Sequence, residues 1–101
     1  MAAADPVLLT EGETALERGD WAAARSVFTA AVERESSPDG YYGLARAEEW
    51  AGDFHAAVRS YERAYAGYRA CGEVRRPSLI AARELSFLHA AVYGNWAMLS
   101  M

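Results

Sequence analysis

One stretch of the chain decides its fold: AGDFHAAVRSYERAY, residues 51–65. Gly52 can adopt the positive φ that ends a helix, and Asp53 can accept hydrogen bonds from the first backbone N–H groups of the next helix. Small and aromatic side chains then follow at spacings of four and three, on one helix face: Ala57, Tyr61 and Ala64. The stretch therefore predicts a helix end, a tight turn and a second helix that another helix can approach closely.

The same pattern occurs earlier and begins again near the end of the sequence. Gly19 and Asp20 precede a helix whose small and aromatic residues stand at the same offsets: Ala24, Phe28 and Ala31. A third start is the run Gly94-Asn95-Trp96. Gly19 and Gly52 are 33 residues apart, whereas Gly94 follows Gly52 after 42 residues. A recurring helix–turn–helix pattern of this length indicates a repeat protein.

We therefore expect an all-α fold, an α-solenoid of antiparallel helix pairs in one domain, residues 1–101. Proline is favoured in the first turn of a helix, so Pro77 should open the fifth helix. The expected fold has five full helices and a short sixth, in repeats at about 5–36 and 38–71 and a truncated third at 77–101.

Composition limits the classes of function. The chain has 14 acidic and 10 basic residues, a net charge of −4, and no basic stripe that could follow a phosphate backbone, which disfavours a DNA-binding helix-turn-helix protein. A single cysteine, Cys71, excludes a disulfide within the chain. We see neither a signal peptide nor a membrane-spanning run, so a cytoplasmic location is the expectation.

The two complete units resemble the tetratricopeptide repeat in their Gly-Asp-aromatic turns, their alanine positions and their spacing. Gly12 and Ala45 stand where that family places a small residue in the first helix of each pair. Residues 77–101 match less well, because Phe87 and Leu99 replace small residues. The sequence of these units also resembles the repeat regions of some actinobacterial LuxR-type transcriptional regulators. That likeness implies a sensing or partner-binding region of a bacterial regulator.

The resemblance further implies a groove lined by the first helix of each pair, which would bind a protein or peptide. The first two pairs would contribute Leu9, Glu13, Glu17, Tyr42, Arg46, Glu49 and Trp50, and the third Glu84, Leu88 and Ala91. Exposed tyrosine and tryptophan beside an arginine are typical of a binding hot spot. The alternative is that Tyr42 and Trp50 cover the contact between the repeats.

No constellation of residues indicates catalysis, a metal or a cofactor, so we expect a protein that is not an enzyme. His55 and His89 belong to different repeats and have no metal ligand at the right spacing. Glu48 and Glu49 are adjacent, point to different sides of a helix and are expected on a solvated face.

A second hypothesis is a structural module whose main partner is itself. The fifth helix is apolar on more than one side, and the sequence ends in an apolar run with no polar outer face. This pattern predicts a homodimer through the C-terminal helices, with these residues at the interface: Leu85, Leu88, Val92, Trp96 and Leu99.

Overall fold

The computed structural model describes residues 6–73 and 75–80. This part of the chain is all-helical and contains no strand, which confirms the predicted all-α class. Its helices are α1 (Pro6–Glu17), α2 (Trp21–Arg34), α3 (Pro38–Trp50), α4 (Phe54–Ala70) and α5 (Arg75–Leu79).

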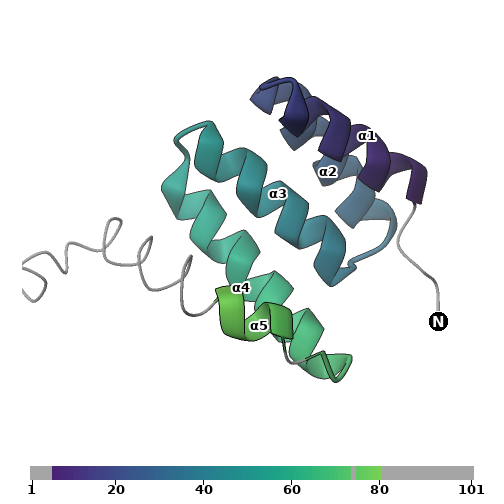
Figure 1. The fold of residues 1–101 in the computed structure, drawn as a ribbon, viewed down its shortest axis with the longest axis vertical. Coiled ribbons are helices and arrows are strands. Elements are labelled where there is room, and N and C mark those ends of the chain that lie inside the picture. The colour runs from purple at the N-terminus through teal and green to yellow at the C-terminus, as the bar shows by residue number, and fades with distance from the viewer. Residues whose placement is uncertain (1–5, 74, 81–101) are drawn as a thin grey trace, which may run out of the picture.

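Short turns join the four longer helices, so each helix reverses direction and packs against the one before it (Figure 1). α2 packs on α1 and on α3, and α3 packs most extensively on α4. α1 also contacts α3, while α5 lies against α4. The contact between α1 and α3 places two helices that are not neighbours in the chain along one face.

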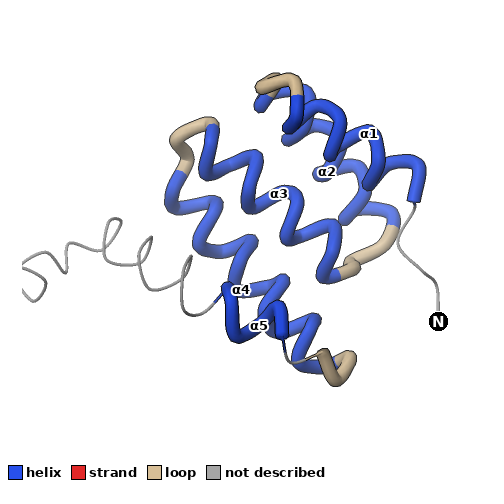
Figure 2. Tube along the Cα trace, in the orientation of Figure 1, coloured by secondary structure: helices blue, strands red, loops and turns tan. Residues whose placement is uncertain are grey.

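The turns form as their sequences predict (Figure 2). Gly19 has φ +74° and Gly52 has φ +88°, the left-handed conformation that ends a helix. Asp20 then caps α2 by accepting a hydrogen bond from Ala23 N at 3.1 Å, and Asp53 caps α4 by accepting one from Ala56 N at 3.2 Å. Equivalent residues therefore start both second helices.

Pro38 and Pro77 differ in how they relate to the start of their helices. Pro38 opens α3 directly after Ser37, whose hydroxyl caps the helix by accepting a hydrogen bond from Gly40 N. The prediction that Pro77 opens the fifth helix is wrong, because α5 begins two residues earlier at Arg75. Proline is tolerated throughout a first turn, where its missing N–H has no partner within the helix, so its position marks a helix start only approximately.

The core is thin and consists largely of alanine contacts between helices. One cluster of buried residues joins α3 to α4 and α5, and it consists of Ala45, Ala57, Val58, Tyr61, Ala64, Tyr68 and Ile80. A second joins α1, α2 and α3, and it consists of Ala15, Leu16, Ala24, Phe28, Leu44 and Ala47. Both central aromatic residues, Phe28 and Tyr61, were predicted to lie on a packed helix face.

Some of the sequence-based predictions fall on other parts of the chain. The sixth helix and all of the predicted dimer contacts, from Leu85 to Leu99, lie outside the described residues. Among the residues that are described, no helix is long and apolar enough to cross a membrane.

Candidate functional site

A groove runs along the face where α1 and α3 meet. It encloses a cavity of about 270 Å³, which is lined by Leu9, Glu13, Asp39, Tyr42 and Arg46. The side chains stand at intervals of three or four along each helix, which keeps them on one face. The structure thus brings four of the predicted groove residues together: Leu9, Glu13, Tyr42 and Arg46.

Arg46 lies at the centre of this groove and is held from two sides. Its Nη1 donates a hydrogen bond to Glu13 Oε1 at 2.7 Å, and its Nη2 donates one to Glu13 Oε2 at 3.4 Å. The guanidinium also lies 5.4 Å from the centre of the Tyr42 ring. Because both Arg46 and Glu13 are partly exposed, the ion pair fixes their geometry while leaving atoms of each accessible to a partner.

Tyrosines of α4 support the floor of the groove. Tyr42 packs edge-on against Tyr61 and Tyr68, with ring centres 6.0 and 6.5 Å apart. Tyr68 Oη donates a hydrogen bond to Asp39 Oδ1 at 2.6 Å, and Tyr61 Oη donates one to Glu49 Oε1 at 2.8 Å. These bonds fix two carboxylates of α3 against the core.

Trp50 marks one end of the same face of α3. Its side chain is exposed, with 65% of the residue's surface accessible. Its ring stacks on Trp21, the first residue of α2, with centres 5.6 Å apart and planes 19° apart. The sequence left two alternatives for Trp50, an exposed binding residue or a cover of the contact between the repeats. In the structure its ring covers the contact between α2 and α3 and remains largely exposed.

The remaining groove residues are placed as follows. Glu17 is exposed at the end of α1, and its side chain forms no hydrogen bond with another described residue. The residues expected from the third pair, Glu84, Leu88 and Ala91, lie outside the described part of the chain. Sequence reasoning missed Asp39, although its spacing of three from Tyr42 places both on one face.

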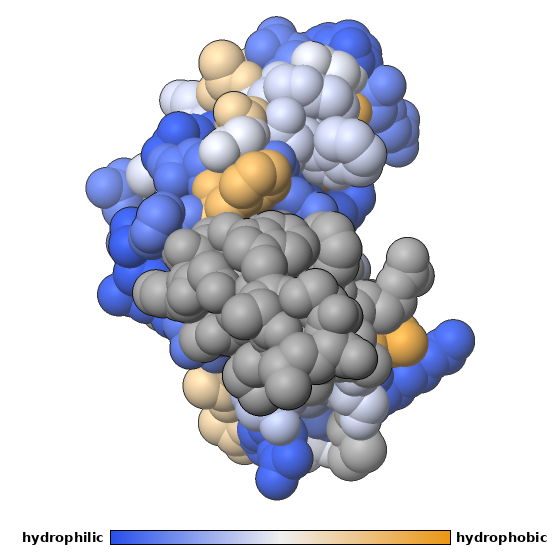
Figure 3. All heavy atoms as spheres, turned by 90° about the vertical axis from the view of Figure 1, so that its left-hand side faces the viewer, coloured by the Kyte–Doolittle hydropathy of each residue, from blue (hydrophilic) through white to orange (hydrophobic). Residues whose placement is uncertain are grey.

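The side of the molecule with the α3–α4 turn is shown in Figure 3. Where described residues are visible in that view, hydrophilic residues surround small separate apolar areas. Large exposed apolar side chains are scattered over three helices and the end of α3, as Val7, Trp50, Phe54 and Leu79. Single exposed apolar residues are normal, so Trp50 is distinguished by its stacked geometry and its place beside the groove.

Glu48 departs from the sequence-based expectation. It was expected on a solvated face, but only 6% of its surface is accessible. Its Oε1 accepts a hydrogen bond from Ser60 Oγ at 2.6 Å. Burial raises the pKa of Glu48, while the Ser60 hydrogen bond opposes that rise. The expectation failed because the partner that makes burial tolerable comes from the next helix.

The described residues do not gather a metal site. They contain no group of three or more histidine, cysteine or acidic side chains that could hold an ion. Cys71 is an exposed free thiol at the end of α4, and His55 is exposed at its start.

The chain was compared with protein-family models, with curated proteins and with solved structures. None of these comparisons found a match. The assignment of a function therefore depends on the residues and geometry described above.

Proposed function

We propose that this chain is a binding module of the tetratricopeptide-repeat type, whose groove along α1 and α3 receives a segment of another protein. The repeat reading is supported by the two turns. Asp20 has φ −91° and ψ 79°, and Asp53, 33 residues later, has φ −90° and ψ 77°. The same backbone geometry at the same interval is what a repeated unit requires.

The observation that carries the binding role is the face of α3. Tyr42, Arg46 and Trp50 stand four residues apart, so they share one side of the helix. Tyrosine, tryptophan and arginine dominate the energetics of protein interfaces because they combine large contact area with directional polar groups. Here the arginine is already oriented by Glu13, which reduces the entropy that binding would cost.

Charge indicates the class of partner. Carboxylates outnumber arginine in the lining of the groove, where Glu13 and Asp39 accompany Arg46. We therefore propose a partner segment that combines an apolar or aromatic anchor with basic side chains. Such a module would suit the sensing part of a larger regulator.

The test is a peptide selection on the purified chain, followed by titration calorimetry of the selected peptides. Trp50→Ala and Arg46→Met should each weaken a micromolar complex by about tenfold or more, because each removes a central anchor. Arg59→Met on α4 is the matched control, since Arg59 does not line this groove. Peptides that bind the Trp50 and Arg46 variants as tightly as the parent would place the binding face elsewhere.

Rising salt should also weaken the complex, because the attraction between basic peptide and acidic groove is screened. A complex whose affinity does not change with salt would contradict the proposed basic partner.

A further inference from the structure

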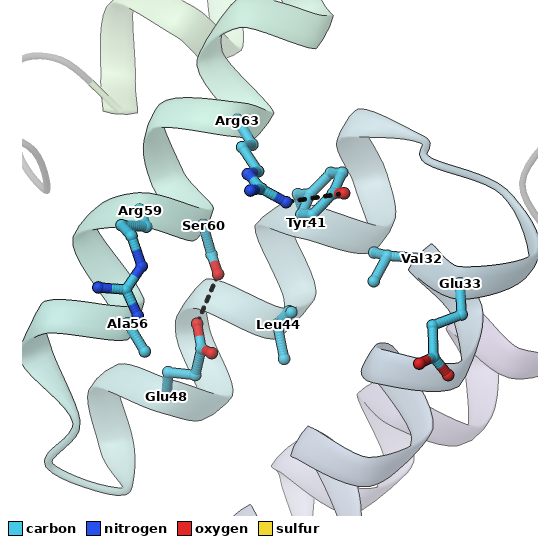
Figure 4. Close-up of a pocket in the computed structure, with 9 residues that line it drawn as sticks. All are labelled: Val32, Glu33, Tyr41, Leu44, Glu48, Ala56, Arg59, Ser60 and Arg63. Atoms are coloured by element: carbon cyan, nitrogen blue, oxygen red, sulfur yellow. Dashed lines mark hydrogen bonds between the residues drawn. The ribbon is translucent and has the colours of Figure 1, made fainter.

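A second cavity lies on the opposite side of α3 from the groove. It has a volume of about 300 Å³, and side chains of α2, α3 and α4 line it (Figure 4). Leu44 and Glu48 of α3 face it, whereas Tyr42 and Arg46 face the groove. Since successive residues of a helix are about 100° apart, these two sets occupy opposite sides of α3. The cavity is therefore independent of the proposed peptide site.

The cavity is bordered by the largely buried Glu48, one of whose carboxylate oxygens has no hydrogen-bond partner among the described residues. Glu48 Oε1 accepts the hydrogen bond from Ser60, but no described residue donates a hydrogen bond to Oε2. Every side-chain oxygen or nitrogen that is sealed from solvent in this part of the chain has a hydrogen-bond partner. Because Oε2 has no such partner, it must be accessible to solvent. A largely buried carboxylate that retains one open oxygen is a strong acceptor for a cationic donor.

Arginines lie on the α4 side of the same cavity. Arg59 and Arg63 are one turn apart, and Figure 4 shows both on α4, with Glu33 across the cavity on α2. Arg63 donates a hydrogen bond to Tyr41 Oη at 3.3 Å and lies 5.5 Å from the centre of that ring. Arg59 makes no hydrogen bond or ion pair with another described residue.

Glu48 and Arg59 thus border one cavity without pairing with each other. The open Oε2 of Glu48 and the guanidinium of Arg59 can therefore bind a molecule that carries a positive and a negative group. The apolar surfaces of Val32 and Leu44 complete the wall. A cavity of this volume is at the lower limit of ligand pockets, which restricts it to a small metabolite.

We propose that this cavity binds a small zwitterion of the amino-acid class. The ammonium group donates to Glu48 Oε2, and the carboxylate accepts hydrogen bonds from Arg59 and from the guanidinium of Arg63. The short carbon chain of the ligand lies against Leu44. Burial raises the pKa of the Glu48 carboxyl, and a bound ammonium group would oppose that rise by stabilising the ionised form.

Titration calorimetry of the full chain near neutral pH tests the proposal. The probes are the standard amino acids together with β-alanine and 4-aminobutanoate. At least one should bind with one-to-one stoichiometry at a concentration below about 10 mM. Its two half-molecules, the amine and the carboxylate alone, should each bind at least about tenfold more weakly, because each satisfies only one side of the cavity.

Variants then locate the site. Glu48→Gln keeps the shape and can still accept the Ser60 hydrogen bond, and Arg59→Met keeps the alkyl stem at an exposed position. Each should weaken the best probe by about tenfold or more. Arg69→Met, on the same helix and over the Tyr65 ring, is the matched control and should leave the affinity unchanged.

Three results would overturn the proposal. The first is that no probe binds at about 10 mM, and the second is that either variant binds as tightly as the parent. The third is an amine that binds as tightly as the amino acid, which would make the cavity a site for simple cations. Circular dichroism spectra of each variant should match the parent, which separates lost binding from lost folding.

Discussion

The ring of Phe28 in α2 packs directly against the backbone of Gly43 in α3. A Cβ at position 43 would overlap the ring, and so would a Cβ at Gly12 in α1. Phe28 is buried, so its ring cannot move aside into solvent. The two glycines therefore set how closely α1 and α3 approach α2, and with it the width of the groove.

Gly43→Ala should destabilise the chain by about 1–3 kcal/mol, because it overpacks a filled core. Urea unfolding measures the loss. The double variant Gly43→Ala/Phe28→Leu should recover part of it, since the shorter side chain makes room. A double-mutant cycle with no coupling between the two positions would contradict this packing.

Gly52→Val should cost about 1 kcal/mol or more, because a β-branched residue is strained at φ +88°. No other atom lies within 4 Å of the position where a Cβ would stand, so the backbone conformation alone causes the loss. Gly52→Asn is the control and should lose less, since asparagine tolerates the left-handed region. Equal thermal midpoints for Gly52→Val and the parent would show that the turn does not need this conformation.

Ala57→Leu should cost about 1–3 kcal/mol, because residue 57 is fully buried between helices. Ala56→Leu should cost less, although Ala56 is also buried, because it lines the Glu48 cavity and a larger side chain can extend into that space. Thermal unfolding compares the two. A larger loss at Ala56 would mean that the register of α4 is wrong.

Glu48 should make the stability depend on pH. Burial raises its pKa in the folded chain, so over the range between the ordinary carboxyl pKa and the raised one the folded state binds more protons than the unfolded state. The contribution of Glu48 to stability therefore falls as pH rises through that range.

Glu48→Gln removes this titration. As the pH rises from acidic to neutral, the free energy of unfolding of Glu48→Gln should increase relative to that of the parent. Urea unfolding at several pH values measures the shift. A difference that stays constant with pH would contradict the raised pKa.

The Glu13–Arg46 ion pair should contribute little to stability, about 0–1 kcal/mol, because both side chains are partly exposed. Arg46→Met and Glu13→Gln should therefore unfold near the parent's urea midpoint. This matters for the peptide test, since a loss of affinity in Arg46→Met then reports on the groove. A loss above about 2 kcal/mol would mean that the pair supports the fold itself.

Local sequence signals predicted much of the fold. Asp20 and Asp53 act on N–H groups three residues away, so their capping role can be read from adjacent residues. Helix starts follow from such signals: α2 and α4 each begin directly after their capping aspartate, and α3 begins at Pro38, the predicted start of the second repeat. Pro77 was the exception, because any position of the first turn accepts proline.

The sites were less predictable, since their contacts join distant parts of the chain. Trp21 and Trp50 stack across 29 positions, and no local pattern indicates which aromatic rings will meet. The burial of Glu48 depends on Ser60, which comes from the following helix. The groove residues were inferred from a resemblance, and the pairing of Glu13 with Arg46 became visible only with the arrangement of α1 and α3.

The order of helix contacts also has a kinetic consequence. Among the described residues, each substantial contact joins helices that are neighbours in the chain or are separated by one helix. Forming these native contacts therefore requires the closure of short loops only, and the relative contact order is low. We expect refolding in the microsecond-to-millisecond range typical of helical proteins. The same arrangement means that a pulling force applied to the ends of the described part should detach its helices successively, because no substantial contact joins α1 to α4 or α5.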